Sequence, residues 1–164
     1  HQFVTRRLEQ LLIDRGIGPE TVRSVLAERA NRPWLAAKSA KKMNELSRGE
    51  ALQRIVEAYS RPTRIVLGKD VDENLEVDEA AFETDEETAL WNTYTDMKSR
   101  IRPDMEIDDF VNASSSLIRP LDDFFNNVFV MVKDERVRNN RLGLLRRISL
   151  LPKGILDLSL LPGF

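Results

Sequence analysis

The chain has 164 residues, of which 41% are hydrophobic and 32% are charged, so it is long enough to bury a core of its own. It contains no cysteine and a single histidine at position 1, which excludes disulfides, thiolate metal sites, cysteine nucleophiles and most histidine-based catalysis. No apolar run approaches the roughly 20 residues of a membrane-spanning helix. The opening HQFVTRRLEQLL predicts a helix rather than a secretory leader, so we expect no membrane association.

The net charge of −2 is unevenly distributed along the chain. Residues 1–64 carry a net charge of +6, residues 65–118 carry −11, and residues 119–164 carry +3. Such asymmetry suggests a surface for a polyanion. Ion pairs between the basic and acidic blocks in the folded chain are the simpler explanation of this asymmetry, and the charge distribution alone favours that explanation.

Apolar residues recur at helical spacing along most of the chain, and no stretch alternates as a strand does. We expect Pro62 to kink or interrupt one helix, and Pro120 to begin another with Asp122 and Asp123 in its first turn. The acidic stretch at about 69–85 predicts a loop with one short helical turn around 80–82. The expected fold is all-α, a bundle of seven or eight helices in a single domain, 1–164. The helices are expected at about 3–12, 20–31, 34–46, 49–67, 85–101, 105–118, 120–132 and 135–151.

The sequence carries no catalytic motif. It has no glycine-rich phosphate loop and no nucleophile elbow. The adjacent acids Asp108/Asp109 and Asp122/Asp123 imitate a carboxylate pair, but helix neighbours point about 100° apart and do not converge on one site. We therefore predict neither a catalytic residue nor a metal ligand.

The stretch RNNRLGLLRRI, residues 138–148, places one arginine on the apolar side of its helix. On a helical wheel Arg141 falls inside the apolar stripe. An unpaired buried charge costs several kcal/mol, so we expect Arg141 to form a structural ion pair, with Asp122 or Asp123 as its partner. Arg138, Arg146 and Arg147 remain to face outward.

Residues 119–145, RPLDDFFNNVFVMVKDERVRNNRLGLL, combine a proline, an acid, Phe-Phe, an apolar run, an acidic turn and Arg-x-Asn-Arg-Leu. This pattern resembles the C-terminal region of the β subunit of bacterial-type glycyl-tRNA synthetase. Residues 3–33 look like the start of that region, and residues 59–70, YSRPTRIVLGKD, like its basic helix end. DDFV, 108–111, stands in place of the tetrapeptide that names the DALR fold, so no role is carried over to it. The ending at 151–164 is similar to plant organellar members.

The resemblance implies an all-helical DALR-type anticodon-binding domain, related to that of arginyl-tRNA synthetase, in a larger enzyme. It implies tRNA-Gly as a partner, together with the rest of the synthetase (an alpha subunit or fused alpha region, and the rest of beta). No cofactor is expected in this domain, since ATP and Mg would be used elsewhere in the enzyme. The compartment implied is the plastid stroma or mitochondrial matrix for a plant-type protein, and otherwise the bacterial cytoplasm.

Anticodon binding needs cations for phosphates and planar groups for unstacked bases. For each basic candidate named below, a solvated surface position is an alternative explanation to RNA contact. For Asn140, a cap or turn hydrogen bond is the alternative. Trp34, Tyr59, Trp91 and Tyr94 could stack on bases, although aromatics at helical spacing usually lie in the core. A helical protein-docking module stays open as the alternative function, whereas an arginyl-type tail fits the 119–145 pattern less well. The candidate RNA-binding residues are Arg6, Arg7, Lys38, Lys41, Lys42, Arg61, Arg64, Arg138 and Asn140.

Overall fold

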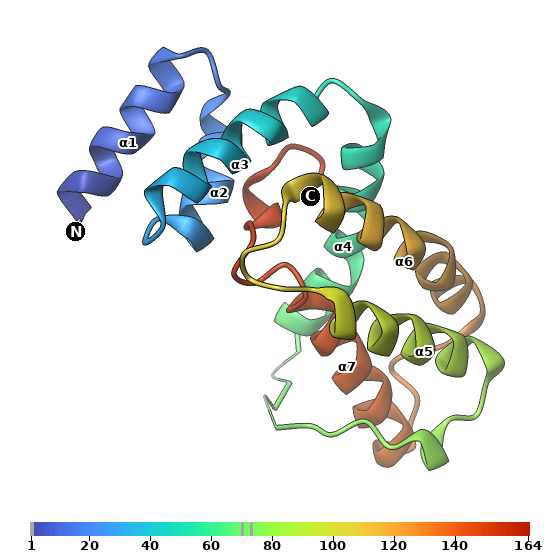
Figure 1. Ribbon diagram of the computed structural model, residues 1–164. Coiled ribbons are helices and arrows are strands. Elements are labelled where there is room, and N and C mark those ends of the chain that lie inside the picture. Colours follow the sequence, from blue (N-terminus) through green and yellow to red (C-terminus); the bar gives the residue numbers. More distant parts are fainter. Residues whose placement is uncertain (1, 70, 73) are drawn as a thin grey trace. The chain divides into compact units, whose positions relative to one another are not determined.

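The computed structural model describes residues 2–69, 71–72 and 74–164. Within these ranges it contains seven α-helices, two 3-10 helices and no strand, which confirms the all-α class (Figure 1). The expected short turn near 80–82 is the first of the 3-10 helices. The elements are α1 Gln2–Asp14, α2 Pro19–Arg29, α3 Pro33–Leu46, α4 Glu50–Leu67, η1 Glu79–Ala81, α5 Asp85–Arg100, α6 Ile107–Asn127, α7 Glu135–Ser149 and η2 Leu158–Leu160.

Two prolines lie inside helices, although proline was expected to interrupt one of them and to begin another. Helix α4 continues through Pro62, and α6 continues through Pro120, so the two helices expected at 105–118 and 120–132 are one. A proline inside a helix removes one backbone hydrogen bond and costs about 3 kcal/mol. In α6 that cost is offset by packing, because Leu117, Leu121 and Phe124 on either side of Pro120 are all buried.

Helix α6 ends at Asn127, earlier than its apolar pattern predicts. We expected Phe129 to continue the buried face, but this side chain is 84% exposed. The carbonyl of Phe129 accepts a hydrogen bond from the Arg141 guanidinium at 2.5 Å. The N–H of Val128 still donates to the carbonyl of Phe124 on α6, whereas the carbonyls of Phe129, Val132 and Lys133 accept from side chains of α7.

The chain divides into two compact units. One, called unit 1 here, contains residues 1–57, 102–112 and 152–164, and the other, unit 2, contains residues 58–101 and 113–151. The chain passes from one unit to the other within α4, within α6, and in the non-helical segments after α5 and after α7.

Unit 1 is organised around Arg29, at the end of α2, which is fully buried. Its Nη1 donates to Ser39 Oγ on α3 at 2.7 Å, and its Nη2 donates to the carbonyls of Pro103 at 3.1 Å and Met105 at 2.7 Å. Its Nε donates to the carbonyl of Gly154 at 3.3 Å. Burial lowers the pKa of Arg29 from its ordinary value, and the nearby Arg32 lowers it further. One side chain thus connects four separate segments.

Gly154 receives two interactions from neighbouring residues of α2. Its N–H donates to Glu28 Oε2 at 3.0 Å, and its carbonyl accepts from Arg29. Gly154 has a φ of +86°, in the left-handed region that residues with a Cβ rarely adopt. Glycine is thus the residue best suited to present both backbone groups to α2.

Unit 2 packs α5 beside α7 (Figure 1). Leu90 and Met97 of α5, and Leu144 and Ile148 of α7, are completely buried. Tyr59 of α4 is also in the core, where its hydroxyl lies 3.0 Å from Ser114 Oγ. Burial raises the pKa of the Tyr59 phenol, so the hydroxyl stays protonated at ordinary pH.

We expect Arg29→Met to lower the free energy of unfolding by about 3 kcal/mol or more, because the buried Ser39 hydroxyl and three carbonyls lose their donor. Urea denaturation followed by circular dichroism measures the change. Arg23→Met on the same helix is the matched control, since Arg23 is exposed and pairs with Glu9; it should cost less than about 1 kcal/mol. Equal midpoints for the two variants would contradict the role given to Arg29.

Candidate nucleic-acid interface

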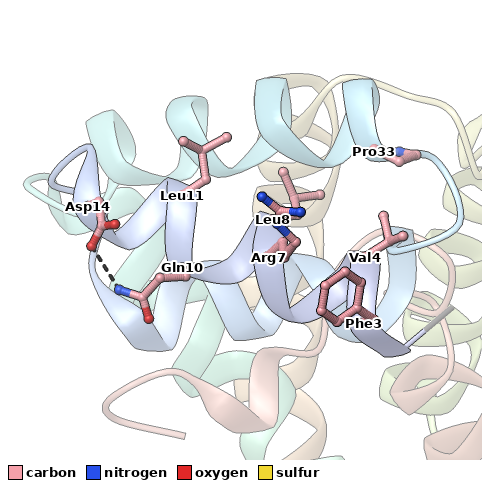
Figure 2. A pocket seen from close by; sticks show the side chains of 8 residues that line it. All are labelled: Phe3, Val4, Arg7, Leu8, Gln10, Leu11, Asp14 and Pro33. Carbon is pink, nitrogen blue, oxygen red and sulfur yellow. Dashed lines mark hydrogen bonds between the residues drawn. The ribbon is translucent and has the colours of Figure 1, made fainter.

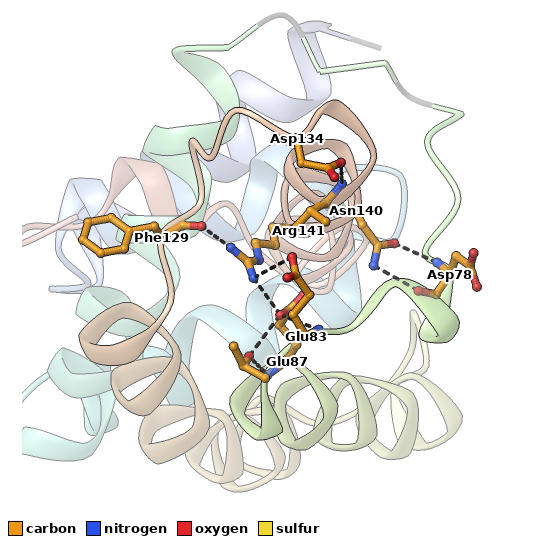
Figure 3. A network of polar contacts seen from close by, with 9 residues as sticks. Asp78, Glu83, Glu87, Phe129, Asp134, Asn140 and Arg141 are labelled. Atoms are coloured by element: carbon orange, nitrogen blue, oxygen red, sulfur yellow. Dashed lines mark hydrogen bonds and ion pairs between the residues drawn. The ribbon is translucent and has the colours of Figure 1, made fainter.

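The Arg141 side chain lies at the centre of a buried network in unit 2 (Figure 3). Arg141 is 5% exposed, and its Nη2 lies 3.0 Å from Oε1 of Glu87, which is fully buried on α5. The other end of the guanidinium, Nη1, donates to the carbonyl of Phe129. The partner is not the one we expected: Asp122 and Asp123 are exposed, and in the described part of the chain neither pairs with Arg141.

Glu87 is held in place by the first turn of its own helix. Thr84 is the N-cap of α5, and its Oγ1 accepts a hydrogen bond from the N–H of Glu87 at 3.2 Å. In return, Glu87 Oε1 accepts from Thr84 Oγ1 at 3.0 Å and from the N–H of Glu83 at 3.2 Å. This arrangement is a variant of the capping box, in which Glu87 bonds the N–H of the residue before the N-cap, and the spacing Thr-x-x-Glu at 84–87 is its sequence signal. Glu87 was absent from the residues predicted for this network, although that spacing is visible in the sequence.

Arg138 is turned toward the backbone rather than outward. Its Nη1 donates to the carbonyls of Val132 at 3.1 Å and Lys133 at 3.3 Å, and the residue is half-buried. Arg138 and Arg141 therefore both bind the irregular segment between α6 and α7. The expectation that Arg138 faces outward is wrong for its guanidinium.

Asn140 is buried, and its amide forms two hydrogen bonds with the backbone of Asp78. Asn140 Oδ1 accepts from the Asp78 N–H at 2.7 Å, and Nδ2 donates to the Asp78 carbonyl at 3.0 Å. The amide thus makes the kind of turn hydrogen bond that was the alternative to RNA contact. The Asp78 carboxylate accepts from Arg136 at 2.7 Å, and that hydrogen bond lowers the pKa of Asp78.

The remaining arginines of α7 are also not simply outward-facing, contrary to expectation. Arg147 is half-buried and donates to the carbonyl of Leu75 at 3.0 Å. Arg146 is half-buried as well. The polar residues of α7 thus hydrogen-bond the backbone of 75–78 on one side and of 129–133 on the other.

Arg61 and Arg64, on the second half of α4, are both exposed. The Arg61 guanidinium lies over the ring of Phe125, on α6, at 4.2 Å from the ring centroid. A guanidinium stacked on an aromatic ring at the surface keeps its N–H groups available for acceptors in the plane of the stack. Of the cations predicted in unit 2, these two are exposed, whereas Arg138 is half-buried.

Helix α1 carries the exposed residues Arg6 and Arg7, and Figure 2 shows Arg7 among the side chains that line an open apolar pocket. Phe3 is 70% exposed, and the Arg7 guanidinium lies 5.6 Å from its ring centroid. Leu12 is the one buried residue of this helix. The apolar periodicity of α1 therefore predicts its helical form correctly. It does not predict which apolar residues are buried, since Phe3 belongs to the periodic pattern and is exposed.

The three lysines predicted as a phosphate stripe lie on α3. Lys38 is exposed and forms an ion pair with Glu106 at 2.6 Å, and its Nζ lies 5.5 Å from the ring centroid of Trp34. Lys42 pairs with Glu45 at 3.4 Å. Lys41 is exposed. The three lysines therefore differ in their environment: Lys38 and Lys42 have carboxylate partners, and Lys41 has none among the described residues.

The four aromatic residues that could stack on bases differ in how far they are buried. Tyr59 and Tyr94 are buried, and burial raises the pKa of Tyr94. Trp91 is half-buried, and its indole N–H donates to Glu79. Trp34 is 76% exposed. Of these four, Trp34 alone presents most of its ring to solvent.

The described residues contain no group of three or more His, Cys, Asp or Glu side chains that could hold a metal ion. Among the same residues, no helix is both long enough and apolar enough to cross a lipid bilayer.

The described residues thus form an all-helical domain with exposed cations on α1, α3 and α4 and with hydrogen-bonded polar residues on α7. The chain belongs to the DALR anticodon binding domain family, whose profile matches residues 55–158.

Glycine–tRNA ligases are similar to the chain over nearly its whole length. It is 65% identical over 164 residues to the chloroplastic/mitochondrial glycine–tRNA ligase 2 of Arabidopsis thaliana, covering 100% of the chain and 15% of that protein. It is 31% identical over 166 residues to the glycine–tRNA ligase beta subunit of Halothermothrix orenii, covering 96% of the chain and 23% of the subunit. The beta subunit of Pseudoalteromonas translucida is 29% identical over 163 residues, covering 98% and 24% respectively. The chain thus spans less than a quarter of the length of these relatives.

We expect Arg141→Ala to lower the free energy of unfolding by about 3–5 kcal/mol, because it leaves the fully buried Glu87 carboxylate without its cation. Chemical denaturation measures the difference. Arg136→Ala on the same helix removes an exposed pair with Asp78 and should cost less than about 1 kcal/mol. An unchanged midpoint for Arg141→Ala would show that the buried pair contributes little.

Proposed function

We propose that this chain is the anticodon-binding domain of a glycine–tRNA ligase and that it binds the anticodon arm of glycine tRNA. The observation that carries the proposal is the family match over residues 55–158, joined to similarity over the full chain with glycine–tRNA ligases. Residues 1–164 act in this proposal as one functional domain.

The surface chemistry supports the proposal within each unit. In unit 2, Arg61 and Arg64 are exposed near the ring of Phe125. In unit 1, Arg6 and Lys41 are exposed. Cations bind phosphates, and unpaired loop bases need planar partners, so this composition suits a single-stranded RNA loop.

Attachment of glycine to tRNA would take place in other parts of the longer protein. We propose that an alpha subunit or fused alpha region, and the rest of the beta region, supply the site that uses ATP and Mg²⁺. Those parts and tRNA-Gly are the proposed partners. Because the Arabidopsis relative is named as chloroplastic/mitochondrial, we propose the plastid stroma or the mitochondrial matrix as the compartment, with the bacterial cytoplasm as the alternative.

Fluorescence anisotropy tests the proposal directly. The chain is titrated into labelled glycine tRNA, and in parallel into a transcript in which the two cytosines shared by glycine anticodons are replaced. We expect the altered transcript to bind about tenfold or more weakly, because a base read through its edge contributes on the order of 1–3 kcal/mol.

Each other result has a defined meaning. Equal affinity for the two transcripts would limit the domain to phosphate contacts and contradict anticodon recognition. No binding of either transcript at moderate salt would favour the alternative, a helical protein-docking module.

We expect the double variant Arg61→Ala, Arg64→Ala to weaken tRNA binding and to reduce the dependence of affinity on salt, by a slope of about 0.7–0.9 for each phosphate that the variant no longer binds. Its melting temperature should change little, because the exposed stack of Arg61 on Phe125 contributes only about 0.5–1 kcal/mol. Arg100→Ala, at the exposed end of α5 in the same unit, is the charge control. A variant that loses its melting transition, or one whose salt slope equals that of the control, would contradict this assignment.

A further inference from the structure

A groove in unit 1 lies between α1 and α3, and the family assignment does not explain why an exposed tryptophan and several cations line it. Trp34 of α3 forms part of its wall, with Arg15 just after α1 and Lys41 on α3. Leu12 and Ile17 provide apolar surface. The groove thus combines a large planar ring, an apolar floor and cationic side chains.

Trp34 is the planar element of this groove. A tryptophan buries about 150–250 Å² in most proteins, yet here 76% of the residue is in contact with solvent. Lys38 lies over the ring at 5.5 Å from its centroid and so covers one face. With so much of the residue exposed, the opposite face is open to a planar ligand.

The charge of the groove is positive once its existing pairs are taken into account. Lys38 is paired with Glu106, and Glu45 is paired with Lys42, so these four charges largely compensate one another. Arg15 and Lys41 are exposed, and neither side chain forms a hydrogen bond or an ion pair with residues 2–69, 71–72 and 74–164. Two cations therefore remain available to an anionic ligand.

Trp34, Lys38 and Lys41 share one face of α3, at positions i, i+4 and i+7. With a rise of about 1.5 Å per residue, Lys41 lies about 10 Å along the helix axis from Trp34. Single-stranded nucleic acid is bound in this way in many proteins, with bases stacked on aromatic rings and the backbone following a line of cations.

We propose that this groove binds an unpaired nucleotide of RNA, with its base stacked on the open face of Trp34 and its backbone phosphates paired with Arg15 and Lys41. The inference rests on the proposed function in that it takes RNA as the ligand class. It goes further, because it assigns a stacking residue and two phosphate ligands in unit 1, all of them before residue 55, where the match to the family profile begins.

The chain has two tryptophans, which makes stacking directly measurable. Trp91→Phe leaves Trp34 as the single tryptophan, and this variant is titrated with hexacytidylate at moderate salt. We expect strong quenching of Trp34 fluorescence, because a stacked base quenches the indole. The reciprocal Trp34→Phe variant reports Trp91, which is half-buried and bonded to Glu79, and it should show no comparable quenching.

The affinity of hexacytidylate should follow the same residues. Trp34→Ala is expected to weaken binding by about five- to 150-fold, which corresponds to the roughly 1–3 kcal/mol of one base stack. Trp34→Tyr should keep most of the affinity, since its ring is also planar. Arg15→Gln and Lys41→Gln should each reduce the salt slope by about 0.7, whereas Arg48→Gln, an exposed cation outside the groove, should not.

The outcomes separate this inference from the proposed function. If glycine tRNA binds with anticodon dependence while Trp34 is not quenched and Trp34→Ala binds normally, the groove proposal is overturned and the function stands. If Trp34 is quenched but tRNA binding ignores the anticodon, the groove stands as a nucleotide site and the proposed function fails. Absence of quenching by any RNA overturns the groove proposal and favours a protein partner for this surface.

Discussion

A guanidinium removed from water must find a partner for its charge and its N–H groups, and this constraint organises both units of the chain. Arg29 meets it in unit 1 with the Ser39 hydroxyl and three backbone carbonyls, and with no carboxylate within hydrogen-bonding distance among the described residues. Arg141 meets it in unit 2 with Glu87 and one carbonyl. In each unit, segments without regular secondary structure are fixed by being the acceptors of a buried cation.

This explains why an arginine-rich helix need not be a nucleic-acid ligand. Helix α7 resembles a basic recognition helix in sequence, but Arg138, Arg141 and Arg147 all donate to backbone carbonyls outside it. Asn140 does the same for Asp78. The exposed cations lie instead on other helices, such as Arg61 above the ring of Phe125. The arginines that hold the domain together are thus distinct from those that can contact a ligand.

Helical periodicity was sufficient to predict the fold class and most helix positions, because each helix buries an apolar stripe. It failed where long-range contacts decide. Pro120 lies inside α6 because buried residues on both sides keep the helix continuous, and Phe129 leaves the helix because Arg141 binds its carbonyl. The wheel placed Arg141 on the buried side but could not identify Glu87, which lies 54 residues away. Arg29 gave no signal, since most of its acceptors are backbone groups that any sequence provides.

The wide separation of these contacts along the chain also bears on how the domain is made during translation. Unit 1 is assembled from three stretches, and Ser24 near the beginning exchanges hydrogen bonds with Asp157 near the end. The Arg29 side chain obtains its Gly154 acceptor only after 125 further residues have been synthesised. In a ribosome-bound nascent chain that does not yet include Gly154, the Arg29 guanidinium lacks one of the acceptors that it has in the folded unit. Helices α1 to α3 would therefore stay loosely packed until residues 152–164 have emerged and unit 1 can close.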